Sequence, residues 1–220
     1  MLYRTFRPRS WQDFIGNPKA IATVRRIIGR PGFDRGAFWI DAAGQHNSGI
    51  GKTSLALLIA ESLADPFYIT EIDGSRCDKA AVGAMLQAAY LKTPHVDKPY
   101  RVWVVNEAHA MTSGAVDAFL TFLEALPPHT VVVFTTTRKA DENLFGDHDS
   151  GPFASRCHCI TLTNQGLAQS FARRAQEIAK SEGLDGQPIG AYVRLVQSCR
   201  NNFRAVLQQI EAGAMLTEGA

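Results

Sequence analysis

Five short apolar segments, separated by helical patterns, constrain the fold of this chain more than any other feature. The segments are 37–42, 67–72, 101–106, 130–136 and 157–162. Runs such as Val102–Val105 and Val131–Phe134 are apolar without alternation, which is typical of strands covered on both faces. Helical patterns fill the gaps at 52–64, 79–91 and 114–126. This alternation predicts an α/β fold with a five-stranded parallel sheet flanked by helices.

Only helical patterns follow the last apolar segment. The stretch 164–183 has apolar positions at helical spacing and ends at Gly183, and two further helices are expected at 188–199 and 201–216. We therefore predict two domains, an α/β domain over 1–163 and a small all-helical domain over 164–220.

Composition narrows the class of protein. The chain has 220 residues and a net charge of +2, and its apolar runs are far shorter than a membrane span. Its basic N-terminus lacks the apolar core of a signal peptide, so we expect a cytoplasmic protein without a membrane partner. The four cysteines form no C-x-x-C pair, so we expect reduced thiols and no zinc.

The stretch GQHNSGIGKTS at 44–54 is close to a phosphate-binding loop. It lies between a predicted strand and a predicted helix, where free backbone N–H groups meet phosphates. The usual first glycine is replaced by His46, and Gly44 lies two residues earlier. Lys52 is expected to bind the β- and γ-phosphates and Thr53 to bind Mg²⁺. The candidate nucleotide-binding residues are Ser48, Gly49, Ile50, Gly51, Lys52, Thr53 and Ser54; the alternative is a glycine-rich loop with an incidental lysine.

The buried segment 101–106 ends in Asn106-Glu107, where an Asp-Glu pair is typical of nucleotide hydrolases. The first residue supports Mg²⁺, and Asn106 keeps an acceptor oxygen but lacks the negative charge. Glu107 is the candidate base that activates the attacking water. The sequence alone predicts that Asn106→Asp lowers the Mg²⁺ concentration needed for activity. A surface carboxylate after a core strand is the alternative interpretation of Glu107.

Three further side chains are candidates for contact with the γ-phosphate. The stretch FTTTR ends the predicted strand with Thr135, Thr136 and Thr137. A hydroxyl there, with Thr137 as the main candidate, would hold the attacking water, although threonine is also common in strands. Arg156 in the Ser-Arg-Cys stretch 155–157 would stabilise the charge on a transferred phosphoryl group of a neighbouring subunit. Arg204, near the start of the last predicted helix, would contact the nucleotide from the helical domain. Each arginine alone is more often a solvated surface residue.

Together these motifs resemble the clamp-loader branch of the AAA+ ATPases, and the nearest families are the bacterial DNA polymerase III gamma/tau subunit and the replication factor C small subunits. The segments YRTFRPRSWQDFIGN, EIDGS at 71–75, NEAHAMTSGAVDAFLTFLEALPPHTVVVFTTT and SRC carry the likeness. The resemblance implies an AAA+ nucleotide-binding domain followed by a lid. It makes Arg7, Pro8, Phe14 and Ile15 adenine-pocket candidates, Arg156 an arginine finger and Arg204 a lid arginine.

The resemblance also implies cofactors and partners. ATP and Mg²⁺ are the expected ligands. The expected partners are other AAA+ subunits, a sliding clamp and primer–template DNA. The subunits would form a homo- or hetero-oligomer, and pentamers are typical of the family. Arg76 and Lys79 are the candidate contacts to the DNA backbone, which would be independent of sequence.

Several departures from the family pattern leave the function open. His46 and Asn106 predict weakened hydrolysis, the family's four-cysteine zinc module is missing, and the acidic loop 138–154 is long. The chain ends after the lid, without a helical collar domain. We therefore retain three hypotheses: an active ATPase subunit of a clamp-loader-like machine, a weak or inactive subunit that donates Arg156 in an oligomer, and an AAA+ ATPase of another DNA-processing assembly.

Overall fold

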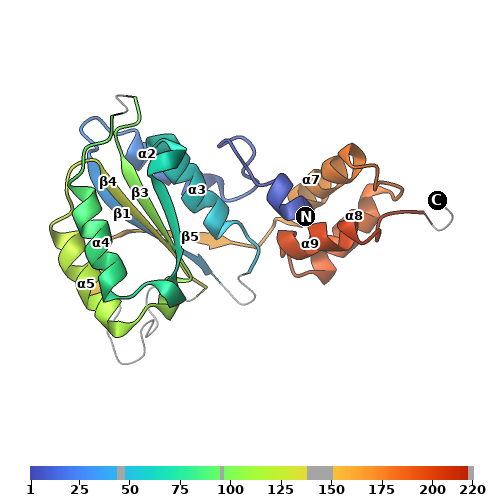
Figure 1. Cartoon of the computed structure of the whole chain (residues 1–220). Coiled ribbons are helices and arrows are strands. Elements are labelled where there is room, and N and C mark those ends of the chain that lie inside the picture. Colours follow the sequence, from blue (N-terminus) through green and yellow to red (C-terminus); the bar gives the residue numbers. More distant parts are fainter. Residues whose placement is uncertain (44–47, 95–96, 138–150, 218–220) are drawn as a thin grey trace. The chain divides into compact units, whose positions relative to one another are not determined.

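The computed structural model describes residues 1–43, 48–94, 97–137 and 151–217 (Figure 1). His46 and Gly44 lie outside the described residues, and so does most of the acidic loop, at 138–150. Among the described residues, no helix is both long and apolar enough to cross a membrane.

The chain divides into two compact units, which we describe separately. The α/β unit comprises Pro18–Ala42 and Lys52–Leu162, and the helical unit comprises Met1–Asn17, Ala43–Gly51 and Thr163–Ala220. The predicted boundary near Thr163 assigned the first 163 residues to one domain. Two earlier segments instead group with the helical C-terminal part, namely Met1–Asn17 and a second segment that includes Ser48 to Gly51. A division into two independently folding domains stays a prediction.

The α/β unit is built on one five-stranded sheet with the strand order β2-β3-β4-β1-β5. The strands are β1 (Arg35–Ala43), β2 (Ile69–Asp73), β3 (Arg101–Asn106), β4 (Thr130–Thr135) and β5 (His158–Thr163). The pairs β1–β4, β3–β4 and β2–β3 are parallel, and their registers bring Asn106 opposite Asp73 and Thr135 opposite Ile40. The predicted α/β fold with a parallel five-stranded sheet is therefore confirmed.

Helices lie on both faces of this sheet (Figure 1). They are α2 (Pro18–Ile28), α3 (Lys52–Leu63), α4 (Lys79–Ala89), α5 (Ser113–Glu124) and the short α6 (Gly151–Ala154), with single 3₁₀ turns η1 (Pro66–Tyr68), η2 (Gly74–Arg76) and η3 (Ala108–Ala110). α2 and α3 lie on one side, and α4 and α5 lie on the other. Every residue of the inner strand β4 is buried, whereas most of the edge strand β2 is exposed or half-buried. Full burial on both faces explains the apolar runs of β3 and β4.

The predicted strand 67–72 is wrong at its first two residues. Phe67 and Tyr68 belong to η1, because Pro66 favours a turn and the carboxylate of Asp65 accepts a hydrogen bond from the Phe67 backbone N–H (3.0 Å). The strand begins only at Ile69, and the Phe67 side chain is 83% exposed.

Aromatic side chains fill the core between the sheet and α4, α5 and α6. The buried rings include Trp39, Phe119, Phe134 and Phe153. The centre of the Phe134 ring lies 4.9 Å from that of Phe153 and 5.0 Å from that of Phe119. Both contacts are edge-to-face, the geometry that aromatic pairs prefer, and each contributes about 0.5–1.5 kcal/mol beyond buried area. Phe153 thereby anchors α6, and with it the turn that carries Arg156, to the sheet.

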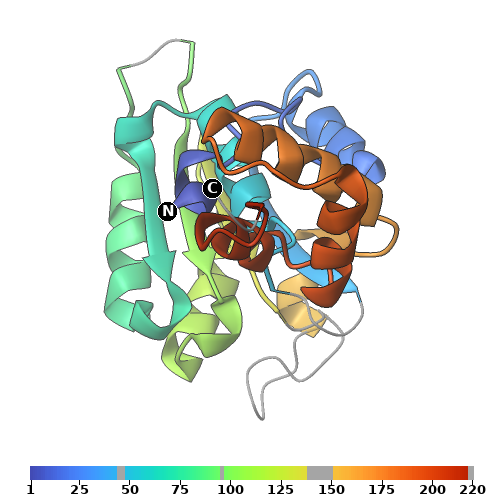
Figure 2. The ribbon, with the colours of Figure 1, turned by 90° about the vertical axis from the view of Figure 1, so that its right-hand side faces the viewer.

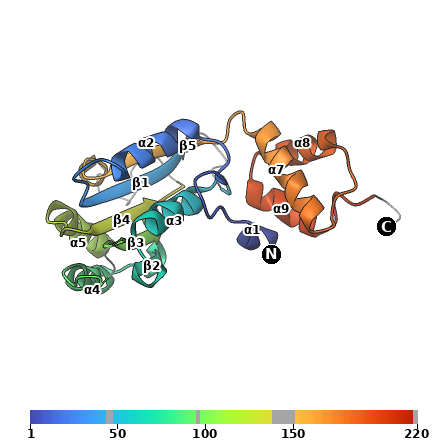
Figure 3. The same cartoon turned by 90° about the horizontal axis from the view of Figure 1, so that it is seen from above.

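The helical unit contains α1 (Leu2–Thr5), α7 (Ala168–Ser181), α8 (Ile189–Ser198) and α9 (Phe203–Glu211). The three longer helices lie close together (Figure 3). They share one core that includes Phe171, Tyr192 and Ile210. α1 packs beside α9 (Figure 2). The side chain of Asn17 accepts a hydrogen bond from the Thr163 backbone N–H (2.8 Å) and donates one to the Thr163 carbonyl (3.1 Å). This pair fixes two distant segments of the unit to each other.

The last two predicted helices are shorter than the sequence indicated. The α9 helix begins at Phe203 and not at 201, because the Asn202 side chain accepts a hydrogen bond from the Ala205 backbone N–H (3.1 Å) and caps the helix. Arg200 and Asn201 have positive φ angles of 54° and 58°, which separates α8 from α9.

Candidate nucleotide-binding site

Polar side chains from four elements meet at the carboxyl end of β3 in the α/β unit. The Asn106 side-chain oxygen accepts hydrogen bonds from the hydroxyls of Thr53 and Thr135, each at 3.0 Å. The Asn106 amide nitrogen donates to the carboxylate of Glu71 at 2.8 Å. We call these four residues the Asn106 cluster. Thr53 and Asn106, which the sequence predicted to act on the same Mg²⁺, are in direct contact.

The topology of the sheet accounts for this meeting. Parallel strands present their carboxyl ends at one edge, and a doubly wound sheet binds its ligands at that edge. Thr53 lies in the first turn of α3, Thr135 ends β4, and Glu71 lies on β2. Lys52, the first residue of α3, is buried with 6% of its surface exposed. A lysine at a helix N-terminus, where backbone N–H groups are free, suits a phosphate ligand.

Glu107 follows the cluster with an unusual backbone. Its φ of 50° and ψ of 48° lie in the left-handed region, which few non-glycine residues adopt. Its carboxylate lies 3.5 Å from both the Thr137 hydroxyl and His109 Nδ1, and the side chain is 44% exposed. Its backbone carbonyl leaves no room for a side chain at Gly74, where a Cβ atom would be 2.4 Å away. The carboxylate therefore stays accessible while its backbone is tightly held.

Two residues of this region were not predicted as site residues. Glu71 was noted only as part of a family segment, and His109 was assigned no role. Thr135 was one of three threonines considered for the γ-phosphate, and its contact with Asn106 was not predicted. Thr136 contacts His109 Nδ1 through its hydroxyl at 3.1 Å. Period-two alternation along β2 and β4 was a usable signal for Glu71 and Thr135, since it places both on the same sheet face as Asn106.

The predicted phosphate loop residues Ser48–Gly51 belong to the helical unit. The Gly49 carbonyl accepts a hydrogen bond from the Phe203 backbone N–H (3.2 Å). A Cβ atom at Gly49 would be 1.8 Å from the Asn202 side-chain oxygen, and φ at Gly49 is +71°. Only glycine fits this close approach between the loop and the start of α9.

The predicted adenine-pocket residues lie in the same unit. Phe14 is buried, and a Cβ atom at Gly51 would be 3.0 Å from its ring. Arg7, Pro8 and Ile15 are half-buried. The N-terminal segment and the glycine loop are therefore in contact through Phe14.

The arginine of the last helix is exposed. Arg204 lies in the first turn of α9, and its guanidinium carbon is 5.5 Å from the centre of the Tyr3 ring. This cation–π contact holds the side chain on α1 of the same unit.

The predicted arginine finger is paired within its own chain. The Arg156 guanidinium donates to the Pro152 carbonyl (2.5 Å) and forms an ion pair with Glu124. Its side chain is 29% exposed, and that of Glu124 is 59% exposed. Arg156 is not part of the Asn106 cluster.

The predicted DNA-contacting residues Arg76 and Lys79 are exposed, in η2 and at the first position of α4. Acidic side chains separate and flank them. Asp78 caps α4 by accepting from the Ala81 N–H (2.8 Å), and the Asp73 carboxylate accepts from the Ser75 N–H (2.9 Å) and hydroxyl. The bond from the Ser75 hydroxyl holds the pKa of Asp73 below its usual value.

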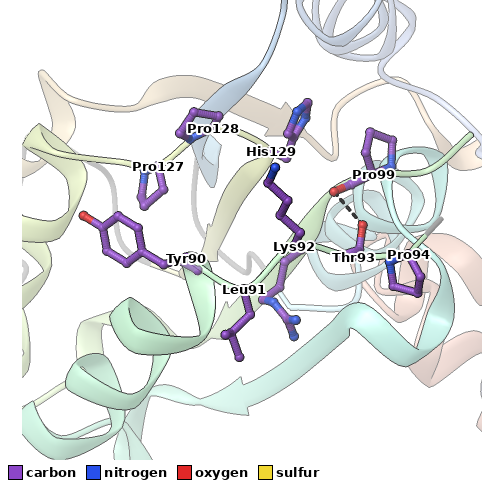
Figure 4. A pocket seen from close by; sticks show the side chains of 11 residues that line it. Tyr90, Leu91, Lys92, Thr93, Pro94, Pro99, Pro127, Pro128 and His129 are labelled. Atoms are coloured by element: carbon purple, nitrogen blue, oxygen red, sulfur yellow. Dashed lines mark hydrogen bonds between the residues drawn. The ribbon is translucent and has the colours of Figure 1, made fainter. Parts of the chain in front are cut away.

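A separate open pocket of about 540 Å³ lies at the opposite edge of the sheet (Figure 4). Tyr90 and Leu91 after α4, Arg101 at the start of β3 and His129 before β4 line it, together with several prolines. Tyr90 and Leu91 are 67% and 64% exposed. This pocket lies at the amino ends of β3 and β4 and is therefore distinct from the Asn106 cluster.

The donor atoms suit Mg²⁺ better than a transition metal. Among the described residues, no group of three or more His, Cys, Asp or Glu side chains could hold a metal ion by itself. Mg²⁺ takes one or two protein oxygens and completes its shell with phosphates and water. The Thr53 hydroxyl and the Asn106 amide oxygen fit the role of these protein oxygens. The thiols at Cys77 and Cys157 are free, and burial raises their pKa values, that of Cys77 to about 11.

Part of the chain is similar in sequence to known proteins. Residues 47–145 match the family described as "ATPase family associated with various cellular activities (AAA)". The chain is 28% identical over 159 residues to the DNA polymerase III subunit gamma/tau of Mycobacterium tuberculosis, covering 62% of this chain and 27% of that protein. It is 26% identical over 160 residues to the DNA polymerase III subunit gamma of Buchnera aphidicola, covering 62% and 42%. The chain thus spans less than half the length of these relatives.

Solved structures support the fold. The RuvB Holliday junction branch migration motor of Thermotoga maritima superposes with a TM-score of 0.65 at 18% identity, covering 94% of this chain and 64% of that one. A RuvB variant from the same organism gives 0.70 at 17% identity, covering 94% and 65%. The fold is the α/β fold of AAA+ proteins, and the family match over residues 47–145 agrees with it. Within that class, the sequence matches support the clamp-loader branch, as the resemblance predicted.

Proposed function

We propose that this chain is an ATP-binding and ATP-hydrolysing subunit of a clamp-loader-like DNA replication machine. The Asn106 cluster carries the proposal. In it, the Thr53 hydroxyl of the phosphate-binding motif lies 3.0 Å from the side-chain oxygen of Asn106 at the end of β3. Glu107 follows directly, with an accessible carboxylate. A phosphate-binding helix start, an oxygen donor set and an adjacent base are the parts that phosphoryl transfer to water requires.

Each residue then has a chemical role. Lys52 and the N–H groups at the start of α3 bind the β- and γ-phosphates, together with Ser48–Gly51 and Ser54. Thr53 and Asn106 would hold Mg²⁺. When bound, this ion would neutralise part of the phosphate charge. The Glu107 carboxylate accepts a proton from the water that attacks the γ-phosphorus, and the bond to the ADP oxygen breaks. Thr137 donates to Glu107 at 3.5 Å and orients that carboxylate.

The remaining roles involve the helical unit and a second subunit. Arg7, Pro8, Phe14 and Ile15 bind the adenine, and Arg204 contacts the nucleotide from α9 after leaving the Tyr3 ring. Arg156 acts on the γ-phosphate of a neighbouring AAA+ subunit. Because its guanidinium is paired with Glu124 in the single chain, assembly must replace that ion pair with a contact to the nucleotide.

The expected partners are other AAA+ subunits, a sliding clamp and primer–template DNA, with Arg76 and Lys79 on the DNA backbone. One observation favours a weaker enzyme as the second candidate. Asn106 brings no charge to the metal position, so a subunit that binds ATP weakly and mainly donates Arg156 fits the same geometry. The likeness in fold to RuvB keeps an AAA+ ATPase of another DNA-processing assembly as the third candidate.

Thermal unfolding with Mg-ATP tests the core of the proposal. A ligand that binds only the folded chain raises its melting temperature, so millimolar Mg-ATP should stabilise wild type, and Lys52→Ala should remove the effect. An unchanged melting temperature for wild type would refute nucleotide binding. Phosphate release with and without primer–template DNA and a candidate sliding clamp then separates the three functions. Stimulation by both indicates a clamp loader, stimulation by DNA alone indicates another DNA-processing machine, and nucleotide binding with little release under all conditions indicates the weak subunit that donates Arg156.

A further inference from the structure

The carboxylate that the motif lacks at position 106 is present on the neighbouring strand. Glu71 lies on the edge strand β2, and its carboxylate accepts a hydrogen bond from the Asn106 amide nitrogen at 2.8 Å. In the parallel register Glu71 pairs with Val104 and Asp73 pairs with Asn106. Glu71 and Asn106 are therefore diagonal neighbours on one face of the sheet, close enough for direct contact.

The contact determines which way the Asn106 amide points. An ionised carboxylate only accepts hydrogen bonds, so the amide nitrogen must face Glu71. The single amide oxygen then faces the hydroxyls of Thr53 and Thr135. Without Glu71, the amide could rotate and present its nitrogen, which cannot support a cation, to Thr53.

The second acidic residue on the same face of β2 has a different task. The Asp73 carboxylate accepts two hydrogen bonds from Ser75 and so holds its own turn. Among the hydrogen bonds of the described residues, it is Glu71 that joins β2 to Asn106.

We propose that Glu71 is a positioning residue for the Mg-nucleotide site, and that the Glu71–Asn106 pair replaces the single carboxylate usually found at the end of this strand. Glu71 fixes the Asn106 oxygen toward Thr53 and supplies one negative charge through the intervening amide. This inference rests on the proposed function, since it assumes that Thr53 and Asn106 serve Mg-ATP.

The proposal changes the expected effect of restoring the acid. The sequence alone predicts that Asn106→Asp tightens Mg²⁺ binding. With Glu71 in place, however, a second carboxylate would stand within hydrogen-bond distance of the first without a proton donor between them, and the two would repel. Asn106→Asp should therefore weaken Mg²⁺ binding by itself and be tolerated only together with Glu71→Gln, because the side-chain amide that Glu71→Gln introduces can donate to the new carboxylate.

A double-mutant cycle tests this coupling. Wild type, Glu71→Gln, Asn106→Asp and the double variant are compared by binding of a fluorescent ATP analogue across a Mg²⁺ titration, and by melting temperature without nucleotide. Each single variant should raise the Mg²⁺ concentration for half-maximal binding by about three- to tenfold, a modest effect because Glu71 is exposed to water. The double variant should return to within about twofold of wild type, a strongly non-additive result.

Glu61→Gln is the matched control, since it removes an exposed carboxylate from α3 that does not belong to the cluster. It should leave the Mg²⁺ requirement unchanged. Additive effects at 71 and 106, or a Glu71→Gln variant identical to wild type, would overturn the pairing while leaving nucleotide binding intact. A wild-type chain with no Mg²⁺-dependent nucleotide binding would instead refute the proposed function, and this inference with it.

Discussion

Asn106 and Arg156 illustrate two ways in which this chain holds a side chain of its ATPase motifs. At the end of β3, Asn106 contacts residues from α3, β2 and β4, and its orientation is fixed from several sides. In the turn after α6, Arg156 is held by Glu124 and by the Pro152 carbonyl, both on the surface of its own unit. The first arrangement is organised before any ligand arrives. The second must exchange an existing ion pair for a new contact.

The difference agrees with the chemistry proposed for each residue. A side chain that supports a metal ion inside one subunit benefits from preorganisation, because no bond must then be broken on binding. A guanidinium that acts across a subunit interface is useful only after assembly, and a surface ion pair of low strength holds it until then. The proposed role of Arg156 therefore depends on its release from Glu124.

Removal of Arg156 should produce the largest effect. Arg156→Ala should lower steady-state phosphate release of the assembled protein by about 10³-fold or more, while the isolated subunit still binds Mg-ATP. Mixing Arg156→Ala with Lys52→Ala should restore part of the activity, because one interface then contains an intact lysine and an intact arginine.

Glu124→Gln is the control for this prediction, because it removes the ion pair and keeps the guanidinium. Its turnover should stay within about threefold of wild type, since an exposed pair contributes little energy. If Glu124→Gln loses as much activity as Arg156→Ala, the arginine works through Glu124 within its own subunit, and the contrast with Asn106 disappears.

Glu107→Gln tests the preorganised side of the comparison. It should reduce phosphate release by about 10²–10⁴-fold, because it removes the base, and it should leave the Mg-ATP-induced rise in melting temperature intact. Isothermal titration with a non-hydrolysable ATP analogue provides an independent measure of binding. Equal turnover of the variant and wild type would show that Glu107 is no base.

Thiol labelling gives the smallest expected effect and compares the two regions directly. Cys77 follows η2 near the Asn106 cluster, and Cys157 follows Arg156; burial raises both pKa values, so both thiols should react slowly with iodoacetamide at pH 8. Below these pKa values the thiolate fraction, and with it the rate, rises about tenfold per pH unit. Exposed Cys159 should react first in mass-spectrometric peptide mapping.

Glu124→Gln should accelerate labelling of Cys157 a few-fold and leave Cys77 unchanged, because only the turn after α6 loses a contact. Equal acceleration at both cysteines would indicate general loosening of the α/β unit and would contradict a separate, releasable Arg156 turn.

The sequence predicted the sheet well because its inner strands are buried on both faces and therefore apolar throughout. The boundaries of β3, at 101–106, were predicted without error. The α2 helix was missed, although Pro18 at its start and the apolar residues Ile21, Val24 and Ile28 at helical spacing were readable signals. The start of β2 was misplaced because the capping contact of Asp65 outweighs the strand preference of Phe67 and Tyr68.

Side-chain partnerships were harder to predict than elements. Thr53 and Asn106 were expected to meet because motif spacing and sheet topology determine where both lie. The pairs Glu71–Asn106 and Arg156–Glu124 join residues far apart in sequence, and the approach of Gly49 to Asn202 depends on how the loop packs in the helical unit. Alternation along β2 indicates the sheet face of Glu71 but not its partner, and the other two contacts follow from tertiary packing that has no local sequence signal.

The left-handed backbone at Glu107 has a consequence for how this chain can evolve. A glutamate in that conformation has a steric cost of about 1–2 kcal/mol relative to an unstrained backbone, and glycine avoids this cost although it loses more conformational entropy on folding. A lineage that had given up hydrolysis would gain folding stability from glycine at this position, at no loss to the donation of Arg156. Selection for stability and selection for turnover therefore act in opposite directions on residue 107, and homologues that carry glycine there would mark the point at which the base was abandoned.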